Sequence, residues 1–152
     1  MLQSATDHEE TFRDGDVIVR EGEDGREMYV IQRGSVSVSK TIAGREVEMA
    51  RLERGEFFGE MSLLESLPRN ATIRAVGETT LLVVKPGSLL LKIRRNPTFA
   101  CEMLLQMSKR LRKVNERLVA LMGSDEVAAQ FSERLAEARL ATEFGEDSDG
   151  AR

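Results

Sequence analysis

The chain has 152 residues, of which 41% are hydrophobic and 32% are charged, with a net charge of −4. This composition is typical of one soluble globular domain; the negative charge disfavours a nucleic-acid surface, and neither a membrane-spanning run nor a signal peptide is recognisable. Because there is a single Cys101 and a single His8, an internal disulfide and a zinc-type cluster are both excluded, and we expect a cytoplasmic protein without a metal.

The N-terminal half of the chain predicts β structure. Residues 1–11 are polar, and we expect them to be loose. From Phe12 onward, short apolar runs alternate with turn signals, which is typical of an all-β sandwich or roll. Strands are predicted at residues 17–19, 28–31 (ended by Arg33 and Gly34), 36–38, 47–52 and 79–84, with a hairpin turn at residues 43–45.

Residues 55–75 form the stretch around which the chain is organised. Gly55 makes a turn, Phe57 and Phe58 end a buried strand, and Gly59 allows a close approach to the backbone. A short helix is predicted over residues 60–66 and is stopped by Pro68. The chain is then extended again over residues 71–75, where apolar and polar residues alternate.

This order of residues indicates an anion site. A glycine that leads into a short helix leaves backbone N–H groups unpaired at the helix start, and these donors attract a phosphate. Arg69 follows on the next loop, and its planar guanidinium suits bidentate phosphate contact. Glu60 would repel a phosphate but accepts a hydrogen bond from a ribose 2′-hydroxyl. Together they predict a small ligand with both a sugar hydroxyl and a phosphate.

The runs FGEMSLL at residues 58–64 and PRNAT at residues 68–72 resemble the phosphate-binding cassette of cyclic nucleotide-binding domains. The resemblance extends over roughly residues 12–122 and implies a mainly β fold with C-terminal helices. The β part would be an antiparallel β-roll of the jelly-roll type at residues 12–95, followed by a long dimerisation helix.

The resemblance also implies roles for individual residues. Glu60 would bind the ribose 2′-hydroxyl and Arg69 the cyclic phosphate, and the rest of the cassette would complete the ligand-binding set: Phe58, Gly59, Met61, Ser62, Asn70 and Ala71. Val38 and Met49 would lie near the base, although plain core packing explains both at least equally well.

The base is expected to be adenine, with cyclic GMP bound within about tenfold of cyclic AMP, because one neutral hydrogen bond is worth only about 0.5–1.5 kcal/mol. Asn70 stands where many family members carry threonine or alanine; its oxygen either accepts from the amino group of guanine or faces water. Asn115, on the long helix, either accepts from the exocyclic amine of adenine or is a solvated residue beside the helix seam.

Helices are predicted for the rest of the chain. Ser88 is expected to cap a helix that begins at Leu89, and Asn96 and Pro97 open a long helix over residues 96–122. Apolar residues recur in this helix in steps of three and four, which is the a/d pattern of a coiled coil: Leu104, Met107, Leu111, Val114, Leu118 and Leu121. We expect a parallel homodimer through this seam; the alternative is packing on the helix's own β-roll.

Gly123 is expected to end the long helix. A second helix is predicted over residues 123–142, with an apolar face at Val127, Phe131, Leu135 and Ala138. Residues 143–152 are acidic and small, and a disordered tail is predicted for them.

These features favour a cytoplasmic cyclic nucleotide receptor, with cyclic AMP or cyclic GMP as its ligand and no cofactor, that signals through a helical dimer to an effector protein. The main alternative is a ligand-free interaction module that keeps the fold. A DNA-binding regulator is disfavoured by the acidic charge, and a β-roll enzyme by the lack of metal ligands. We therefore expect no catalytic residues and no nucleic-acid or membrane partner.

Overall fold

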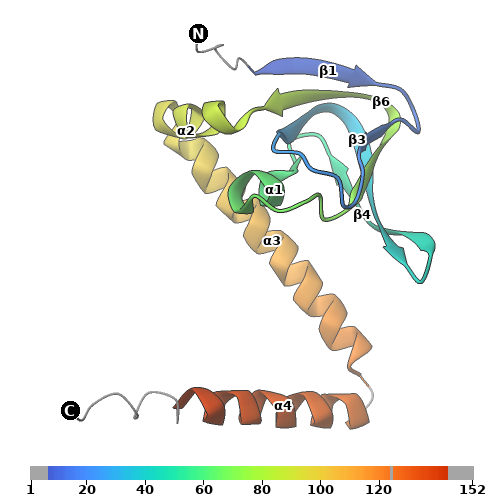
Figure 1. Cartoon of the computed structure of the whole chain (residues 1–152), viewed down its shortest axis with the longest axis vertical. Coiled ribbons are helices and arrows are strands. Elements are labelled where there is room, and N and C mark those ends of the chain that lie inside the picture. The colour runs from blue at the N-terminus through green and yellow to red at the C-terminus, as the bar shows by residue number, and fades with distance from the viewer. Residues whose placement is uncertain (1–6, 124, 144–152) are drawn as a thin grey trace. The chain divides into compact units, whose positions relative to one another are not determined.

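The computed structural model describes residues 7–123 and 125–143 and divides the chain into two compact units, Met1–Gln106 and Met107–Arg152. The first unit contains the strands β1 (His8–Phe12), β2 (Val17–Val19), β3 (Met28–Ile42), β4 (Arg45–Glu53), β5 (Phe57–Phe58) and β6 (Thr72–Val84) (Figure 1). It also contains the helices α1 (Glu60–Glu65) and α2 (Pro86–Arg95) and the first part of α3 (Pro97–Leu121). The second unit contains the rest of α3 and α4 (Asp125–Glu143).

The predicted fold class is confirmed, because the strands form an antiparallel β-roll and helices follow it. The sheet has the order β1-β6-β3-β4, with β2 also paired to β6 and β5 to β3, and every pairing is antiparallel. Two long strands, β3 and β6, therefore form the centre of the sheet and pair with each other.

The prediction that a strand ends at Arg33 and Gly34 was wrong, because β3 continues through both residues to Ile42. Gly34 has a φ of 83°, and the β3–β6 register shifts on either side of Arg33. A Cβ at Gly34 would lie 2.5 Å from the carbonyl oxygen of Glu78. Glycine thus marks a bulge inside a strand here, and sequence alone does not distinguish a bulge from a turn.

The prediction of a loose segment over residues 1–11 was wrong for its second half. His8–Phe12 form β1, which pairs with β6 from His8↔Val83 to Phe12↔Thr79. The strand was missed because its side chains are mostly polar and exposed, while its main-chain hydrogen bonds require no apolar side chain. Residues 1–6 lie outside the described part of the chain.

The core of the first unit lies within the roll and is built from buried residues of five strands: Val19, Tyr29, Ile31, Val36, Leu52, Phe58, Ile73, Leu81 and Val83. The rings of Tyr29 and Phe58 stack with their centroids 4.9 Å apart, an arrangement that aromatic pairs favour. Since Phe58 is the first of the residues predicted to bind the ligand, this stack anchors one end of the cassette to the core.

The helices differ in detail from the prediction. Lys85 is the N-cap of α2 and Pro86 lies at its start, so Ser88 is not the cap; its hydroxyl donates to the carbonyl of Lys85 at 3.0 Å and to Asp7. Proline at the first position lacks an N–H that would be unpaired there in any case, which explains the earlier start. The start of α3 is attached to the roll, because Met103 is buried and Gln106 Nε2 donates to the carbonyl of Gly55 at 2.8 Å.

In the second unit, α3 ends at Leu121 and α4 extends to Glu143, one residue beyond the predicted end. The predicted acidic tail from residue 144 onward lies outside the described residues, as does the side chain of Val127. No described helix combines the length and apolarity that a membrane crossing requires.

Candidate functional site

The cassette begins with a backbone turn that only glycine fits. Gly59 is the N-cap of α1, with a φ of 82°. A Cβ at this position would lie 2.7 Å from the carbonyl oxygen of Glu27 and 2.9 Å from Nη1 of Arg69. Any side chain at this position would therefore be strained and would clash, so Gly59 allows the loop that contains Glu27 to approach the start of α1.

The helix α1 buries polar residues. Its six residues end at Glu65, one residue before the predicted end. Ser66 takes a left-handed conformation with a φ of 58°, so the helix stops before it reaches Pro68. Glu60 and Ser62 are its buried residues. A buried carboxylate and hydroxyl are unusual on a short helix at a surface, and both belong to residues that the sequence predicted to bind the ligand.

Arg69 is 5% exposed, which is uncommon for an arginine. Its Nη1 donates to the carbonyl of Glu27 at 2.8 Å, and its Nη2 forms an ion pair with the Glu27 carboxylate at 3.3 Å. The guanidinium also lies over the ring of Tyr29, 5.8 Å from its centroid. Its pairing with Glu27 offsets the desolvation of the charge.

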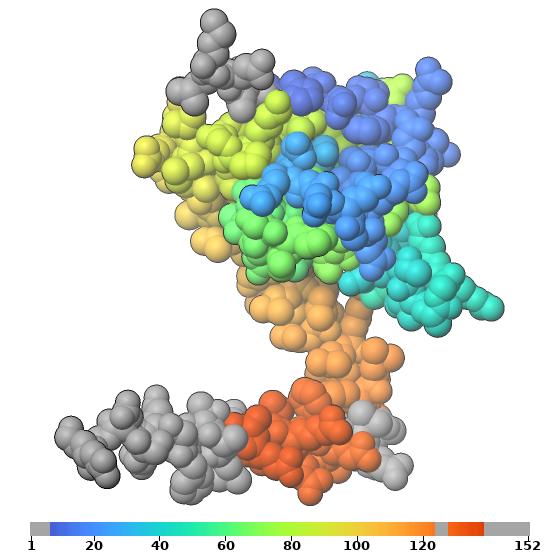
Figure 2. All heavy atoms as spheres, viewed as in Figure 1, coloured from blue at the N-terminus to red at the C-terminus, as the bar shows by residue number. Residues whose placement is uncertain are grey.

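The backbone of Arg69 is fixed as well as its side chain. Arg69 N donates to the carbonyl of Glu23, and Gly22 N donates to the carbonyl of Arg69, both at 2.8 Å. A Cβ at Gly25 would lie 2.6 Å from Arg69 Nε, so the chain of this loop passes directly beside the guanidinium. Figure 2 shows this blue segment against the green cassette. The loop of residues 21–27 thus fixes Arg69, the residue that is predicted to bind the phosphate. Sequence reasoning did not assign this loop to the site.

Burial raises the pKa of Tyr29, and the nearby Arg69 guanidinium opposes that shift. The phenol therefore stays neutral at physiological pH. A neutral, buried ring beneath the guanidinium supports its charge without competing with an anion for it.

The other predicted residues lie in different environments. Ala71 and Val38 are half-buried, and Val38 packs against the core, whereas Met49, Met61 and Asn70 are exposed. The β3–β4 register passes from Val38↔Ala50 to Ser39↔Glu48 and so skips Met49, which lies at a bulge. Asn115 is an exposed residue of α3 in the second unit. Its role toward the base therefore remains a prediction.

Lys40 contacts one of the predicted site residues and was not singled out from the sequence. Its Nζ donates to Oδ1 of Asn70 at 3.2 Å, and Asn70 Nδ2 lies 3.8 Å from the Sδ of Met61. The oxygen of Asn70 thus has a partner that neither sequence-based interpretation considered. The two residues are 30 positions apart in the chain, so no local pattern reveals their contact.

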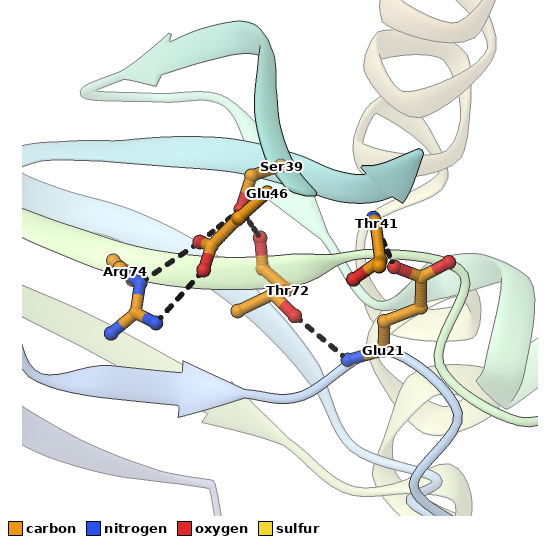
Figure 3. A network of polar contacts seen from close by, with 6 residues as sticks. All are labelled: Glu21, Ser39, Thr41, Glu46, Thr72 and Arg74. Carbon is orange, nitrogen blue, oxygen red and sulfur yellow. Dashed lines mark hydrogen bonds and ion pairs between the residues drawn. The ribbon is translucent and has the colours of Figure 1, made fainter. Parts of the chain in front are cut away.

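A network of polar residues joins the strands beside the cassette (Figure 3). Arg74 donates to both carboxylate oxygens of Glu46, at 3.0 and 3.1 Å, and Ser39 Oγ donates to Glu46 Oε1 at 2.6 Å. These hydrogen bonds lower the pKa of Glu46 to about 2, the contact with Arg74 having the largest effect. The network ties β4 to β6 close to the point where the cassette continues into β6.

Comparisons with known proteins agree with this geometry. The family model of the cyclic nucleotide-binding domain matches residues 9–96, more than half of the chain. The chain belongs to the cyclic nucleotide-binding domain family. It is 35% identical over 108 residues to the cyclic AMP receptor protein of Thermus thermophilus, an alignment that covers 70% of this chain and 50% of that protein.

A shorter match is to a regulatory subunit of a protein kinase. The chain is 46% identical over 67 residues to a cAMP-dependent protein kinase regulatory subunit of Debaryomyces hansenii, covering 44% of this chain and 14% of that protein. The crystal structure of the Thermus thermophilus catabolite activator protein superposes with a TM-score of 0.68 at 34% identity, covering 76% of this chain and 55% of that one. The matches therefore cover between 14% and 55% of the length of these proteins.

Proposed function

We propose that the chain is a cyclic nucleotide receptor that binds its ligand at the cassette of residues 58–71. The observation that carries this proposal is the buried Arg69 guanidinium beside Gly59 and the N-terminus of α1. A buried arginine next to helix N–H groups is a fitting anion site. Membership of the cyclic nucleotide-binding domain family supports the same ligand class.

In the proposed complex, the cyclic phosphate binds Arg69 and the backbone N–H groups of α1, and the ribose 2′-hydroxyl donates to Glu60. A guanidinium has five N–H donors, so Arg69 can keep its contact with the Glu27 carbonyl while it binds a phosphate. The Glu27 carboxylate then competes with the phosphate for Nη2, because both are anions. Ligand binding would therefore shift or weaken this ion pair.

The preferred ligand is cyclic AMP, with cyclic GMP as a weaker one. The names of the relatives support this order, since they include a cyclic AMP receptor protein and cAMP-dependent kinase regulatory subunits. A cGMP-dependent protein kinase of Toxoplasma gondii is 46% identical over 66 residues, however, so overall identity does not separate the two ligands.

We further propose that α3 reports occupancy through a parallel homodimer and passes the signal to an effector protein in the cytoplasm. The contact of Gln106 with Gly55 supports this route, because it joins α3 to the turn directly before the cassette. Occupancy would bias an equilibrium between two arrangements of the helix by differential affinity. The proposal includes no catalytic activity and no DNA or membrane partner.

Isothermal titration calorimetry with cyclic AMP and cyclic GMP tests the central proposal. We expect saturable one-site binding of both, with cyclic AMP the tighter ligand. The second candidate is a ligand-free interaction module, which is favoured by one observation: Arg69 is already paired with Glu27 of its own chain. The absence of binding by either nucleotide to the folded protein would establish that candidate instead.

A further inference from the structure

The charge of Arg69 is balanced by a carboxylate of its own chain. Arg69 Nη2 and Glu27 Oε2 are 3.3 Å apart, and the two side chains are 5% and 42% exposed. One positive and one negative charge therefore meet where the phosphate is proposed to bind, and the pair has no net charge. A site built from unpaired cations differs from this one, because it attracts a ligand more strongly with each negative charge that the ligand carries.

Glu27 contacts the guanidinium through its main chain as well as through its side chain. Its carbonyl accepts a hydrogen bond from Arg69 Nη1 at 2.8 Å, and its Oε2 accepts one from the N–H of Arg26 at 3.3 Å. A guanidinium has five N–H donors, so a phosphate can take the place of the carboxylate at Nη2 while the carbonyl contact remains. The displaced carboxylate then stays beside the bound phosphate.

The other neighbours of the guanidinium restrict where a phosphate can bind it. A Cβ at Gly25 would lie 2.6 Å from both Nε and Nη2 of Arg69, and a Cβ at Gly59 would lie 2.9 Å from Nη1. The ring of Tyr29 lies against the guanidinium, 5.8 Å from its central carbon. Because the chain surrounds Arg69 so closely, a phosphate has to share the guanidinium with Glu27 at short range.

We propose that Glu27 is a specificity-determining residue, which admits nucleotides whose phosphate carries one negative charge and disfavours those whose phosphate carries two. The inference rests on the proposed function, in which Arg69 binds the phosphate. A cyclic phosphate is a diester with one charge. The phosphate of 5′-AMP is a monoester with a second pKa of about 6, so it carries nearly two charges at neutral pH. Beside the neutral pair, the second charge gains no net attraction, while its removal from water costs free energy.

The repulsion by Glu27 grows in proportion to the charge of the ligand, because the Coulomb energy is a product of the two charges. Removal of the carboxylate should therefore strengthen the binding of a singly charged ligand by one factor and that of a doubly charged ligand by the square of this factor. For a partly exposed carboxylate on the order of 5 Å from the phosphate, the factor is about 3–15. Glu27 thus lowers the affinity for every anion, and it gains selectivity against the more highly charged ones.

The test is calorimetry at pH 7.5 on the parent and Glu27→Gln with cyclic AMP, 5′-AMP and the methyl ester of 5′-AMP, an open-chain diester with one charge. Competition against cyclic AMP gives the weak dissociation constants. Glutamine keeps the size of glutamate and an oxygen that accepts from Arg69 Nη2. We expect the parent to bind the methyl ester more tightly than 5′-AMP. In Glu27→Gln, both singly charged ligands should bind about 3–15-fold more tightly and 5′-AMP about 10–200-fold more tightly.

Glu23→Gln is the matched control. It removes a carboxylate of the same loop that pairs with Arg20 Nε at 3.8 Å and is 60% exposed, and it should leave the ratio between 5′-AMP and its methyl ester unchanged. An equal change for all three ligands in Glu27→Gln, a parent that binds 5′-AMP more tightly than the methyl ester, or the same shift in Glu23→Gln overturns the inference but not the proposed function. A folded parent that binds neither cyclic AMP nor cyclic GMP overturns both.

Discussion

The cassette and the second half of α3 depart from the usual distribution of residues in opposite directions. In the cassette, Glu60, Ser62 and Arg69 are polar and buried. In α3, the seam residues Leu111 and Leu121 are apolar and exposed, Leu121 to 80%. A buried polar group requires a partner with complementary charge or hydrogen bonds, and an exposed row of apolar groups requires a surface that covers it. The first departure fits the small polar ligand that we propose, and the second fits the partner helix that we propose.

The largest effect is expected from charges placed in the seam. Leu111→Glu with Leu118→Glu would bury four carboxylates in a dimer and cost about 4 kcal/mol or more. Light scattering should then find a monomer where the parent is a dimer, and the monomer should still bind the nucleotide. Leu105→Glu with Val119→Glu is the matched control, because these exposed apolar residues lie off the seam, and this variant should remain dimeric. If the parent is a monomer at micromolar concentration, the homodimer predicted from the heptad pattern of α3 is wrong.

The next largest effect is expected at Arg69. Arg69→Ala removes a charge-assisted contact with the phosphate and should weaken cyclic nucleotide binding by about 2–4 kcal/mol, or roughly 30–1,000-fold in calorimetry. Arg69→Lys should restore only part of this, because the planar geometry is lost. Arg33→Ala, which removes an exposed arginine, serves as the control. Since Arg69 also pairs with Glu27, circular dichroism must first show that the variants are folded; a folded Arg69→Ala that binds as tightly as the parent contradicts the assignment of the cassette.

A smaller effect is expected at Glu60, which tests whether the second buried group of the cassette recognises a sugar. Glu60→Gln exchanges a charged acceptor for a neutral one and should weaken ribonucleotide binding by about 1 kcal/mol, or roughly fivefold. A 2′-deoxy ligand lacks the hydroxyl, so its affinity should hardly change on the same substitution. Equal losses for the two ligands in parallel titrations would show that Glu60 does not bind the 2′-hydroxyl.

The smallest effect is expected at the ion pair of Glu46 and Arg74, whose side chains are both partly exposed. The contact with Arg74 lowers the pKa of Glu46 from 4.5 to about 2 in the folded chain. A carboxylate with a lowered folded pKa stabilises the fold above its unfolded pKa, and this stabilisation is lost as the pH falls from about 4.5 to about 2. Over this range, the melting temperature of Glu46→Gln should therefore fall less steeply with decreasing pH than that of the parent. The difference between the two slopes should be small, because water screens the pair. Arg74→Met should also reduce the slope, but by less, because the hydrogen bond from Ser39 still lowers the pKa of Glu46. An unchanged slope in either variant would contradict the role of the pair.

The sequence by itself determined the features that local signals encode. The order of glycine, acid and arginine in the cassette is contained within residues 59–69, and it predicted the ligand class that family membership supports. The hairpin at Ala43 and Gly44 and the start of α3 at Pro97 were also predicted, because turn residues and proline act on the backbone within a few positions. Each of these signals lies within about ten residues of the structure it specifies.

Only the tertiary structure decided which distant residues complete the site. Glu27 and Arg69 are 42 positions apart, Lys40 and Asn70 are 30 apart, and Glu46 and Arg74 are 28 apart. Glu46 and Arg74 meet because β4 and β6 both pair with β3 in the sheet, and a strand pairing fixed by the packing of a common core leaves no local trace in the sequence. For the same reason Gly34 was taken for a strand end and β1 was missed: both depend on pairing with β6, a strand that lies more than 30 residues further along the chain.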